Sequence, residues 1–328
     1  MAAAGGGITV SCDQDCETSV TPSDATSTSF GRTGERARDL VEGLLAEALP
    51  SGLYIVATPI GNLGDITLRA LATLARADLI YCEDTRHSRA LLTHFAIARP
   101  LRAYHEHNAE RERPRIMAEL AAGRSVALIS DAGTPLVSDP GYKLVRAAVA
   151  AGIRVTSLPG ASAPLAALSC CGLATDAFLF AGFLPTKSGA RRTRLAELAA
   201  TPATLVVFEA PSRLAATLDD MAAVWGDRPA AVARELTKLH EEVRTGGVAE
   251  LARWAAQSAP RGEMVIVVAQ QGAAASAVGD AAIEAHLQTL PATLSLRDAV
   301  KATAAALGVP KTRVYALALA QRKASQAE

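Results

Sequence analysis

Short apolar runs that alternate with helical segments are the feature that most constrains the fold of this chain. Four runs have the length and composition of buried strands: LYIVA (53–57), DLIYC (78–82), SVALI (125–129) and RVTSL (154–158). Between them, apolar residues recur at spacings of three and four, as in amphipathic helices. This alternation predicts a parallel sheet with helices on its faces, and such sheets bind ligands at the carboxyl ends of their strands.

A second series of strand-like runs begins near Phe178 and is spaced less regularly. Its members are FLFAGF (178–183), TLVVFE (204–209), AAVARE (230–235) and MVIVVA (264–269). Helical segments separate them, among them GGVAELARWAAQ. A chain of 328 residues is long enough for two domains, so we predict two α/β domains, at residues 51–170 and 171–272.

The two ends of the chain differ from these domains. Residues 1–50 are expected to form a disordered extension, because the first 32 residues are rich in Gly, Ser, Thr and Asp. One short amphipathic helix is predicted at 36–49, before Pro50. At the other end, residues 280–328 have helical patterns only, and Gly308–Pro310 divides them into a helix-turn-helix-like appendage.

The bulk composition excludes several classes of protein. With 33 basic and 33 acidic residues, the net charge gives no sign of a nucleic acid or membrane partner, although local patches can be hidden. No membrane span or signal peptide is indicated. Five cysteines without a repeating framework argue against a secreted disulfide scaffold, and Cys12 and Cys16 lack the second ligand pair of a zinc site. We therefore expect a cytoplasmic protein without a metal site.

Three loops that follow predicted strands are rich in Gly, Pro and small polar residues: 57–67, 130–141 and 158–168. In the first, Asp65 or Thr67 can cap the next helix. In the third, Ser162 is placed to cap a helix. Since strand-end loops of a parallel sheet converge, the three loops predict a pocket lined by backbone groups and suited to a polar small molecule.

The second of these loops has the clearest ligand signal. Asp139 is expected to cap the following helix, with Pro140 at the first helical position. Neither capping nor strand geometry explains Asp131 and Gly133. Glycine there permits a left-handed backbone or the close approach of another molecule, so a ligand is expected beside them.

Six motifs in order resemble the tetrapyrrole methylase superfamily: VATPIGNLGDITLRAL, CEDTRHSRALL, SDAGTPLVSDPG, LPGASA, FEAPSR and RGEMVIVV. The resemblance runs from about Leu53 to Gln321, and only the first 50 residues depart from the usual pattern. Within the superfamily, the motifs resemble the members that methylate small-subunit ribosomal RNA. The resemblance implies two α/β domains with S-adenosylmethionine in the cleft between them, commonly in a homodimer.

The resemblance also implies a reaction and a set of site residues. The reaction would be methylation of the ribose 2′-hydroxyl of cytidine 1402 in bacterial 16S rRNA. The residues expected around the cofactor are Pro59, Gly61, Asn62, Asp131, Ala132, Gly133, Thr134, Pro135, Ala161, Ser162, Phe208 and Met264.

A ribose hydroxyl is a poor acid, so a nearby base or hydrogen-bond acceptor would help methyl transfer to it. The catalytic candidates at predicted strand ends are Glu83, Asp84 and Glu209. Each has a structural alternative, since Asp84 with Arg86, or Glu209 with Arg213, can form a local ion pair. Three interpretations are open for His105 and His107: a catalytic base, a contact with RNA, or polar loop residues without a function.

Two local clusters of basic residues are candidates for contacts with RNA phosphates. The segment TKSGARRTR contributes Lys187, Arg191, Arg192 and Arg194. The appendage contributes Arg297, Lys301, Lys311, Arg313, Arg322 and Lys323, among which Lys311 and Arg313 follow the break between its helices. The alternative is that these charges only solvate a surface.

Three other functions are compatible with parts of the pattern. A methyltransferase of the same fold could act on a tetrapyrrole carbon or on diphthamide, but relatives acting on corrin rings generally lack the basic C-terminal helix pair. A ribosome-assembly protein with a decayed cofactor site is disfavoured by the intact SDAGTP and LPGAS loops. A nicotinamide-dependent dehydrogenase is disfavoured because the glycine fingerprint of such enzymes is absent.

Overall fold

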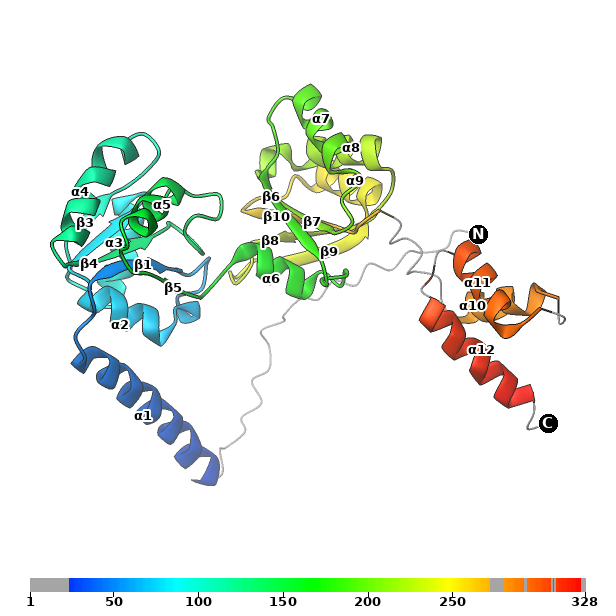
Figure 1. The fold of residues 1–328 in the computed structure, drawn as a ribbon, viewed down its shortest axis with the longest axis horizontal. Helices are drawn as coiled ribbons and strands as arrows, with labels where there is room; N and C mark the ends of the chain where they lie inside the picture. Colours follow the sequence, from blue (N-terminus) through cyan, green and yellow to red (C-terminus); the bar gives the residue numbers. More distant parts are fainter. Residues whose placement is uncertain (1–23, 272–279, 292–293, 308, 310, 326–328) are drawn as a thin grey trace.

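The computed structural model describes residues 24–271, 280–291, 294–307, 309 and 311–325 of the chain. Two bodies that each contain a five-stranded sheet follow one another in the chain, and three helices follow the second body (Figure 1). The prediction of two α/β domains with a helical appendage is confirmed. Cys12 and Cys16 lie outside the described residues.

The first sheet is parallel and has the strand order β3-β2-β4-β1-β5. Its strands are β1 (Gly52–Val56), β2 (Leu79–Cys82), β3 (Leu101–Ala103), β4 (Ser125–Ile129) and β5 (Val155–Leu158). The helices α2 (Leu68–Arg76), α3 (Thr85–His94), α4 (Ala109–Ala121) and α5 (Tyr142–Ala150) connect them. This is the alternation that the sequence predicts.

Strand β1 shows why its sequence has no polar position. Its side chains alternate between the two faces of the sheet, as the strand period of two requires. Leu53 and Ile55 pack into one hydrophobic cluster, and Tyr54 and Val56 pack into another. Because helices cover both faces, every residue of β1 is buried, and the strand reads as a continuous apolar run.

The second sheet is mixed, with the order β6-β7-β10-β8-β9. Its strands are β6 (Phe178–Phe183), β7 (Thr204–Glu209), β8 (Pro229–Arg234), β9 (Glu242–Gly247) and β10 (Met264–Val268). Only β6 and β7 pair in parallel, and the other neighbours are antiparallel. The sequence analysis missed β9, an edge strand whose sequence EVRTGG has two charges and two glycines.

Helices cover both faces of the second sheet (Figure 1). One face packs against α7 (Ser188–Leu198), α8 (Leu214–Trp225) and α9 (Val248–Ser258). The other face packs against α6 (Ala163–Cys170), through Ala167 and Leu168. The predicted limit at residue 170 assigns this helix to the first domain, whereas its packing favours a limit before Ala163.

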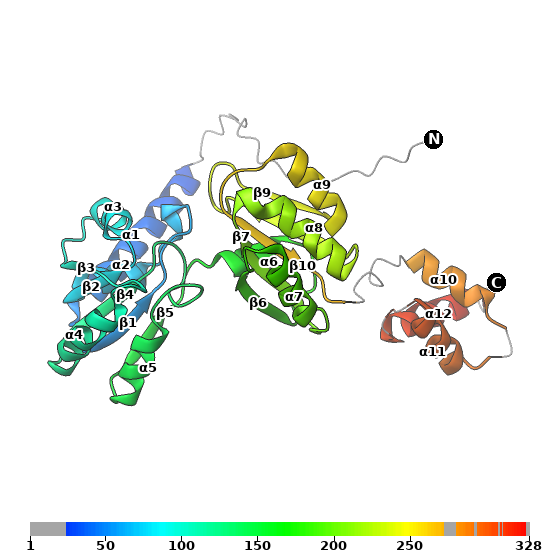
Figure 2. The ribbon, with the colours of Figure 1, turned by 90° about the horizontal axis from the view of Figure 1, so that it is seen from above.

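The two ends of the chain are helical. Helix α1 (Asp24–Ala46) packs against α2 and begins 12 residues before the predicted helix at 36–49. The expectation of disorder throughout the first 32 residues is therefore wrong from Asp24 onward. Helices α10 (Asp280–Thr289), α11 (Leu296–Leu307) and α12 (Lys311–Ser325) share a small core around Ile283 and Val314, beyond the second sheet (Figure 2).

Candidate functional site

The loops after β1, β4 and β5 are joined by backbone and side-chain hydrogen bonds. Thr58 and Gly133 exchange two backbone bonds, with N–O distances of 2.9 and 3.0 Å. The hydroxyl of Ser130 donates to the carbonyl oxygen of Gly133 at 3.0 Å. The hydroxyl of Thr134 donates to that of Ala161 at 3.2 Å. The predicted convergence of the three strand-end loops is thus present in the structure.

The loop between β4 and α5 has an unusual backbone. Gly133, Leu136, Ser138 and Gly141 all have positive φ, at 77°, 73°, 64° and 139°. The φ of Gly133 favours glycine, and a Cβ atom there would also lie in tight contact with Cγ2 of Ile60, at 3.2 Å. Strain of this kind persists where a loop is shaped for function.

This conformation corrects the prediction for Asp139. Helix α5 begins at Tyr142, and Gly141 occupies the N-cap position. The positive φ of Ser138 and of Gly141 interrupts the helical backbone, and Asp139 and Pro140 therefore lie before the helix. By contrast, Thr67 caps α2 by accepting a bond from the N–H of Ala70, and Ser162 occupies the N-cap position of α6 without a side-chain bond.

A first cavity of about 460 Å³ lies between the two sheet domains. Seven of the residues predicted around the cofactor line it: Asp131, Ala132, Gly133, Thr134, Ser162, Phe208 and Met264. The sequence analysis missed other lining residues, which include Ile60, Val137, Asp139, Phe183, Pro211 and Glu263. All of these except Phe183 lie inside the six motifs quoted from the sequence, and that position was the available signal.

Five predicted cofactor residues lie elsewhere. Pro59 and Gly61 line a second cavity of about 390 Å³, which shares Ile60, Asp131, Ala132 and Glu263 with the first. The side chain of Asn62 accepts a bond from the N–H of Gly64 and caps a single helical turn. Pro135 is buried, and Ala161 contributes the carbonyl oxygen bound by Thr134.

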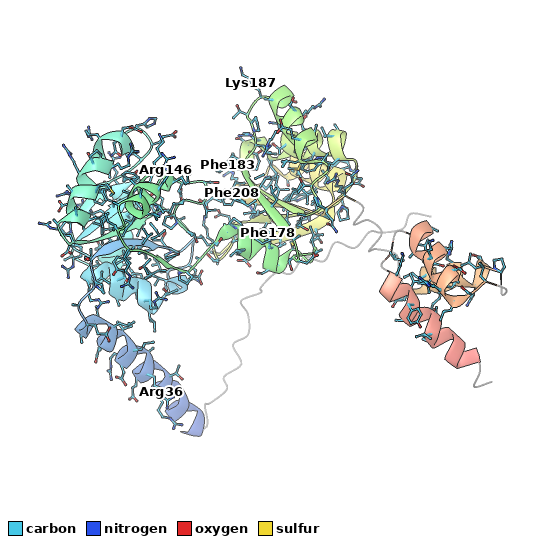
Figure 3. All side chains as sticks on the ribbon, viewed as in Figure 1. Arg36, Arg146, Phe178, Phe183, Lys187 and Phe208 are labelled. Atoms are coloured by element: carbon cyan, nitrogen blue, oxygen red, sulfur yellow. The ribbon has the colours of Figure 1, made fainter. Side chains whose placement is uncertain are left out.

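Aromatic side chains form the wall that the second domain contributes to the first cavity. Phe208 contacts Phe180 and Phe183, with ring centroids 4.9 and 5.4 Å apart. Phe183 is 59% exposed, and Figure 3 shows both Phe183 and Phe208 on the side of the second sheet toward the first domain. A flat apolar surface that remains open to solvent can pack against a planar ligand.

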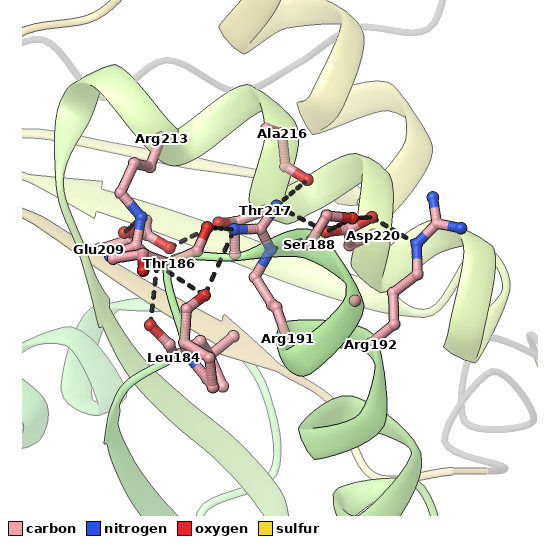
Figure 4. A network of polar contacts seen from close by, with 12 residues as sticks. Leu184, Thr186, Ser188, Arg191, Arg192, Glu209, Arg213, Ala216, Thr217 and Asp220 are labelled. Atoms are coloured by element: carbon pink, nitrogen blue, oxygen red, sulfur yellow. Dashed lines mark hydrogen bonds and ion pairs between the residues drawn. The ribbon is translucent and has the colours of Figure 1, made fainter.

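Glu209 lines the first cavity, but its carboxylate is held by the protein (Figure 4). One oxygen accepts a bond from the N–H of Ala210 at 2.8 Å and faces Arg213 at 3.2 Å. The other accepts a bond from the hydroxyl of Thr217 at 2.5 Å. Since the side chain is fully buried and both oxygens have partners, the geometry favours the structural alternative over a catalytic role for Glu209.

The carboxylates of the first domain differ in their surroundings. Asp84 caps α3 by accepting a bond from the N–H of Arg86, in place of the ion pair considered as the alternative. Asp131 borders both cavities, and its Oδ1 accepts a bond from the N–H of Asp84 at 2.9 Å. Within the described part of the chain, Glu83 makes neither a hydrogen bond nor an ion pair.

Asp139 is the titratable group of the first cavity with the largest shift. Its pKa is raised from 3.8 to about 6, mainly by burial and in addition by the nearby charges of Glu83 and Asp131. A bond from Ser130 opposes the shift. The group therefore titrates near neutral pH, and a positive charge in the cavity would favour its ionised form.

The structure corrects the prediction that Arg191 binds RNA. Its side chain is 5% exposed and pairs with Asp220 at 2.6 Å, while its guanidinium also donates to the carbonyl oxygen of Thr186 (Figure 4). Burial alone would raise the pKa of Asp220, but hydrogen bonds from Arg192, Ser188 and Arg191 together lower it. The guanidinium of Arg191 is therefore part of the buried core of the second domain and is not available to contact RNA.

The other basic residues of TKSGARRTR are more exposed. Arg192 is 55% exposed and donates to Asp220, and Arg194 pairs with Glu197 one turn later. Lys187 is exposed near the start of α7 (Figure 3). In the appendage Lys311 is exposed, whereas the side chains of Arg313, Arg322 and Lys323 lie outside the described residues.

The comparisons with known proteins agree with this geometry. A model of the family described as Tetrapyrrole (Corrin/Porphyrin) Methylases matches residues 52–252, and a model described as RsmI C-terminal HTH domain matches residues 277–322. The chain thus belongs to the tetrapyrrole methylase family, and within it to the ribosomal RNA small subunit methyltransferase I group. S-adenosylmethionine is the cofactor of this family.

Individual relatives support this assignment. The ribosomal RNA small subunit methyltransferase I of Mesorhizobium japonicum is 54% identical over 272 residues, which cover 82% of this chain and 92% of the relative. The protein of that name from Pseudomonas aeruginosa is 48% identical, with coverage of 81% and 96%. A solved structure of the methyltransferase CobJ is 19% identical, has a TM-score of 0.51 and covers 68% of this chain and 95% of its own, and it shows the fold alone.

The first cavity fits S-adenosylmethionine in its chemistry. Its described lining includes four carboxylates, from Asp131, Asp139, Glu209 and Glu263, and no Lys, Arg or His. Such a lining suits a positively charged sulfonium. Phe208 and Phe183 offer flat apolar surface for an adenine ring. The described residues contain no group of three or more potential metal ligands and no helix long and apolar enough to cross a membrane.

Proposed function

We propose that this protein transfers a methyl group from S-adenosylmethionine to the ribose 2′-hydroxyl of a cytidine in small-subunit ribosomal RNA, at cytidine 1402 of the bacterial 16S rRNA. The observation that carries the proposal is the first cavity, in which the strand-end loops of one domain meet the aromatic wall of the other. The names of the relatives, which match this chain over most of its length, support the choice of RNA as substrate.

The chain's own residues have three tasks in this reaction. The loops 131–134 and 162–164, with Phe208 and Met264, hold the cofactor in the first cavity. When bound, S-adenosylmethionine supplies a methyl group on a positively charged sulfur. The domains exclude water from the cleft and orient the acceptor, since holding two reacting groups in place removes much of the entropic cost of a transfer between them.

The proton of the ribose hydroxyl needs an acceptor, and Asp131 is the best placed carboxylate. It borders both cavities, and the N–H of Asp84 fixes one of its oxygens while the other has no hydrogen-bond partner within the described chain. Asp84 thereby acts as a positioning residue. Of the three catalytic candidates from the sequence, Glu83 is the one whose side chain has no hydrogen bond or ion pair in the described chain, but it lines neither cavity.

The proposal also states which part of the chain binds the RNA and how the protein assembles. The helices of the appendage, with Arg297, Lys301 and Lys311 exposed, contact ribosomal RNA phosphates outside the cleft. Arg313 is assigned the same role from its place in the sequence. The homodimer stays a prediction from the family resemblance, and the cytoplasmic location stays a prediction from the composition. Light scattering during size-exclusion chromatography measures the oligomeric state.

The test uses the purified full chain with small ribosomal subunits from a strain that lacks its gene. We expect calorimetry to show binding of S-adenosylmethionine in the presence of a chelator. We also expect label from its methyl group to appear in 2′-O-methylcytidine after digestion of the RNA. Binding of the cofactor without transfer to RNA would reject the proposed substrate and retain the methyltransferase assignment.

A further inference from the structure

The second cavity adjoins the first and has a different electrostatic character. The two cavities share Ile60, Asp131, Ala132 and Glu263, so the methyl donor and a molecule in the second cavity would meet at this common wall. The described lining of the second cavity includes His87, His94 and Lys238, whereas that of the first includes no basic side chain. Its volume of about 390 Å³ lies within the range of about 300–1,000 Å³ that is usual for small-molecule sites.

Helix α3 presents one continuous face to this second cavity. Residues 87, 90, 91 and 94 line it, and their spacing of three and four places them on one side of the helix; Ser88 lines it from the buried edge of this face. Ser88 and Leu92 are buried and anchor the helix on the sheet, while His87, Ala90 and His94 are exposed. Arg86 is also exposed and lies one turn before Ala90, at the rim of this face.

The basic groups on this face are not committed to the fold. Within the described residues, the side chains of Arg86, His87 and His94 have neither hydrogen bonds nor ion pairs. Lys238 differs, because its ammonium pairs with Glu235 at 2.9 Å and with Glu263 at 3.1 Å. A face with free donors beside the methyl donor's cavity is complementary to a polyanion whose reacting hydroxyl must reach Asp131.

Building on the proposed function, we propose that the second cavity takes the ribonucleotide that is methylated, and that the exposed face of α3 holds it. His87 and His94 contact the ribose and base of this nucleotide, and Arg86 contacts an adjoining phosphate. The nucleotide is turned out of its RNA strand to enter, as enzymes require when they act on a group that stacking or pairing would hide. Helix α3, rather than α7, is then the RNA-facing basic helix at the cleft.

Three variants of the full chain test this inference: the double variant His87→Ala/His94→Ala, Arg86→Gln, and the control Arg253→Gln. Arg253 is exposed on α9, has no bond within the described chain and lines neither cavity. All of these side chains are exposed and unbonded, so we expect the unfolding free energies to stay within about 0.5 kcal/mol of the wild type. Small ribosomal subunits from the gene-deletion strain serve as the RNA substrate.

We expect the histidine double variant to lower kcat/KM for the subunits by about tenfold or more, with calorimetric affinity for S-adenosylmethionine unchanged. Arg86→Gln should weaken RNA binding and reduce the salt slope of that binding by about 0.7, the contribution of one phosphate contact with single-stranded RNA. Arg253→Gln should leave both unchanged.

Two results overturn the inference while the proposed function stands. One is that the wild type methylates the subunits and that the histidine double variant and Arg86→Gln have the same kcat/KM and RNA binding as Arg253→Gln. The other is loss of cofactor affinity in the histidine double variant, which would assign the second cavity to the methyl donor. Absence of transfer by the wild type would instead remove the proposed function, and this inference with it.

Discussion

Helices α7 and α3 both carry arginines, but the folded chain pairs those of α7 and leaves Arg86 of α3 without a partner among the described residues. On α7, Arg191 is buried against Asp220, Arg192 shares that carboxylate, and Arg194 pairs with Glu197. On α3, Arg86 has no such partner within the described chain. The comparison teaches that a basic cluster indicates a binding surface only when the fold has not already used its charges.

Replacement of Arg191 should have the largest effect. Arg191→Ala removes the buried partner of Asp220 and leaves only Arg192 and Ser188 to bond its carboxylate, so we expect a loss of about 3 kcal/mol in the free energy of unfolding, measured by urea denaturation. Arg194→Gln is the matched control on the same helix. Its exposed pair should contribute less than about 1 kcal/mol. Equal stabilities for the two variants would contradict the assignment of Arg191 to the core and of Arg194 to an exposed ion pair.

Glu209 is a carboxylate that the fold already uses, in the same way as it uses the guanidinium of Arg191. Glu209→Gln removes the charge that faces Arg213 and disturbs the bond from Thr217, so we expect a loss of about 1.5–3 kcal/mol in stability. Methyl transfer per folded molecule should change little, because both oxygens of Glu209 already have protein partners. A large fall in kcat for a variant that is shown to be folded would restore Glu209 as a catalytic residue.

Asp139 should give a pH-dependent effect. Its pKa is raised to about 6 in the folded state, so between pH 3.8 and about 6 the folded chain keeps a proton that the unfolded chain has lost. The contribution of this group to stability therefore falls as pH rises through that window and is constant above it. Asp139→Asn lacks this loss, and we expect it to be about 1–2 kcal/mol more stable than the wild type above pH 6.

The same shift affects the cofactor site. A cationic ligand in the first cavity favours ionised Asp139, so affinity for S-adenosylmethionine should rise with pH through about 6 in the wild type. Calorimetry across this range should show a weaker dependence for Asp139→Asn. A parallel pH profile for the two proteins would place the titrating group elsewhere.

Removal of residues 1–50 should have the smallest effect. Helix α1 is largely exposed, although it packs against α2 and the hydroxyl of Tyr54 donates to the carbonyl oxygen of Pro50. We expect a chain that begins at Ser51 to lose less than about 1 kcal/mol and to keep its affinity for S-adenosylmethionine. Differential scanning calorimetry and titration measure the two quantities. A large drop in either would give α1 a role in the first domain.

The sequence was most informative where burial is uniform. Strands β4 and β7 have the predicted limits, because a strand that is covered on both faces reads as an uninterrupted apolar run. Strand β9 was missed since an edge strand can carry charges and glycines. An apolar pattern marks a strand only where its neighbours bury it. Strand β9 pairs with β8 alone, so its own residues do not show that it belongs to a sheet.

The candidate site shows the same division. The loops around Gly133 and Ser162 were predictable, because glycines and caps after strands have few structural explanations. The roles of Arg191 and Asp139 were not predictable. Arg191 meets a carboxylate 29 residues away in sequence, and Asp139 lies in a loop whose left-handed residues Leu136 and Ser138 have no sequence signature. Long-range pairing and backbone strain are properties of the folded chain.

The most direct test of the account is mass spectrometry of nucleosides from small-subunit ribosomal RNA of a strain that lacks this gene. The account predicts that one 2′-O-methylcytidine is lost, that the wild-type gene restores it, and that a gene with His87→Ala/His94→Ala restores much less of it than one with Arg253→Gln. An unchanged level of 2′-O-methylcytidine in the deletion strain would contradict the central claim.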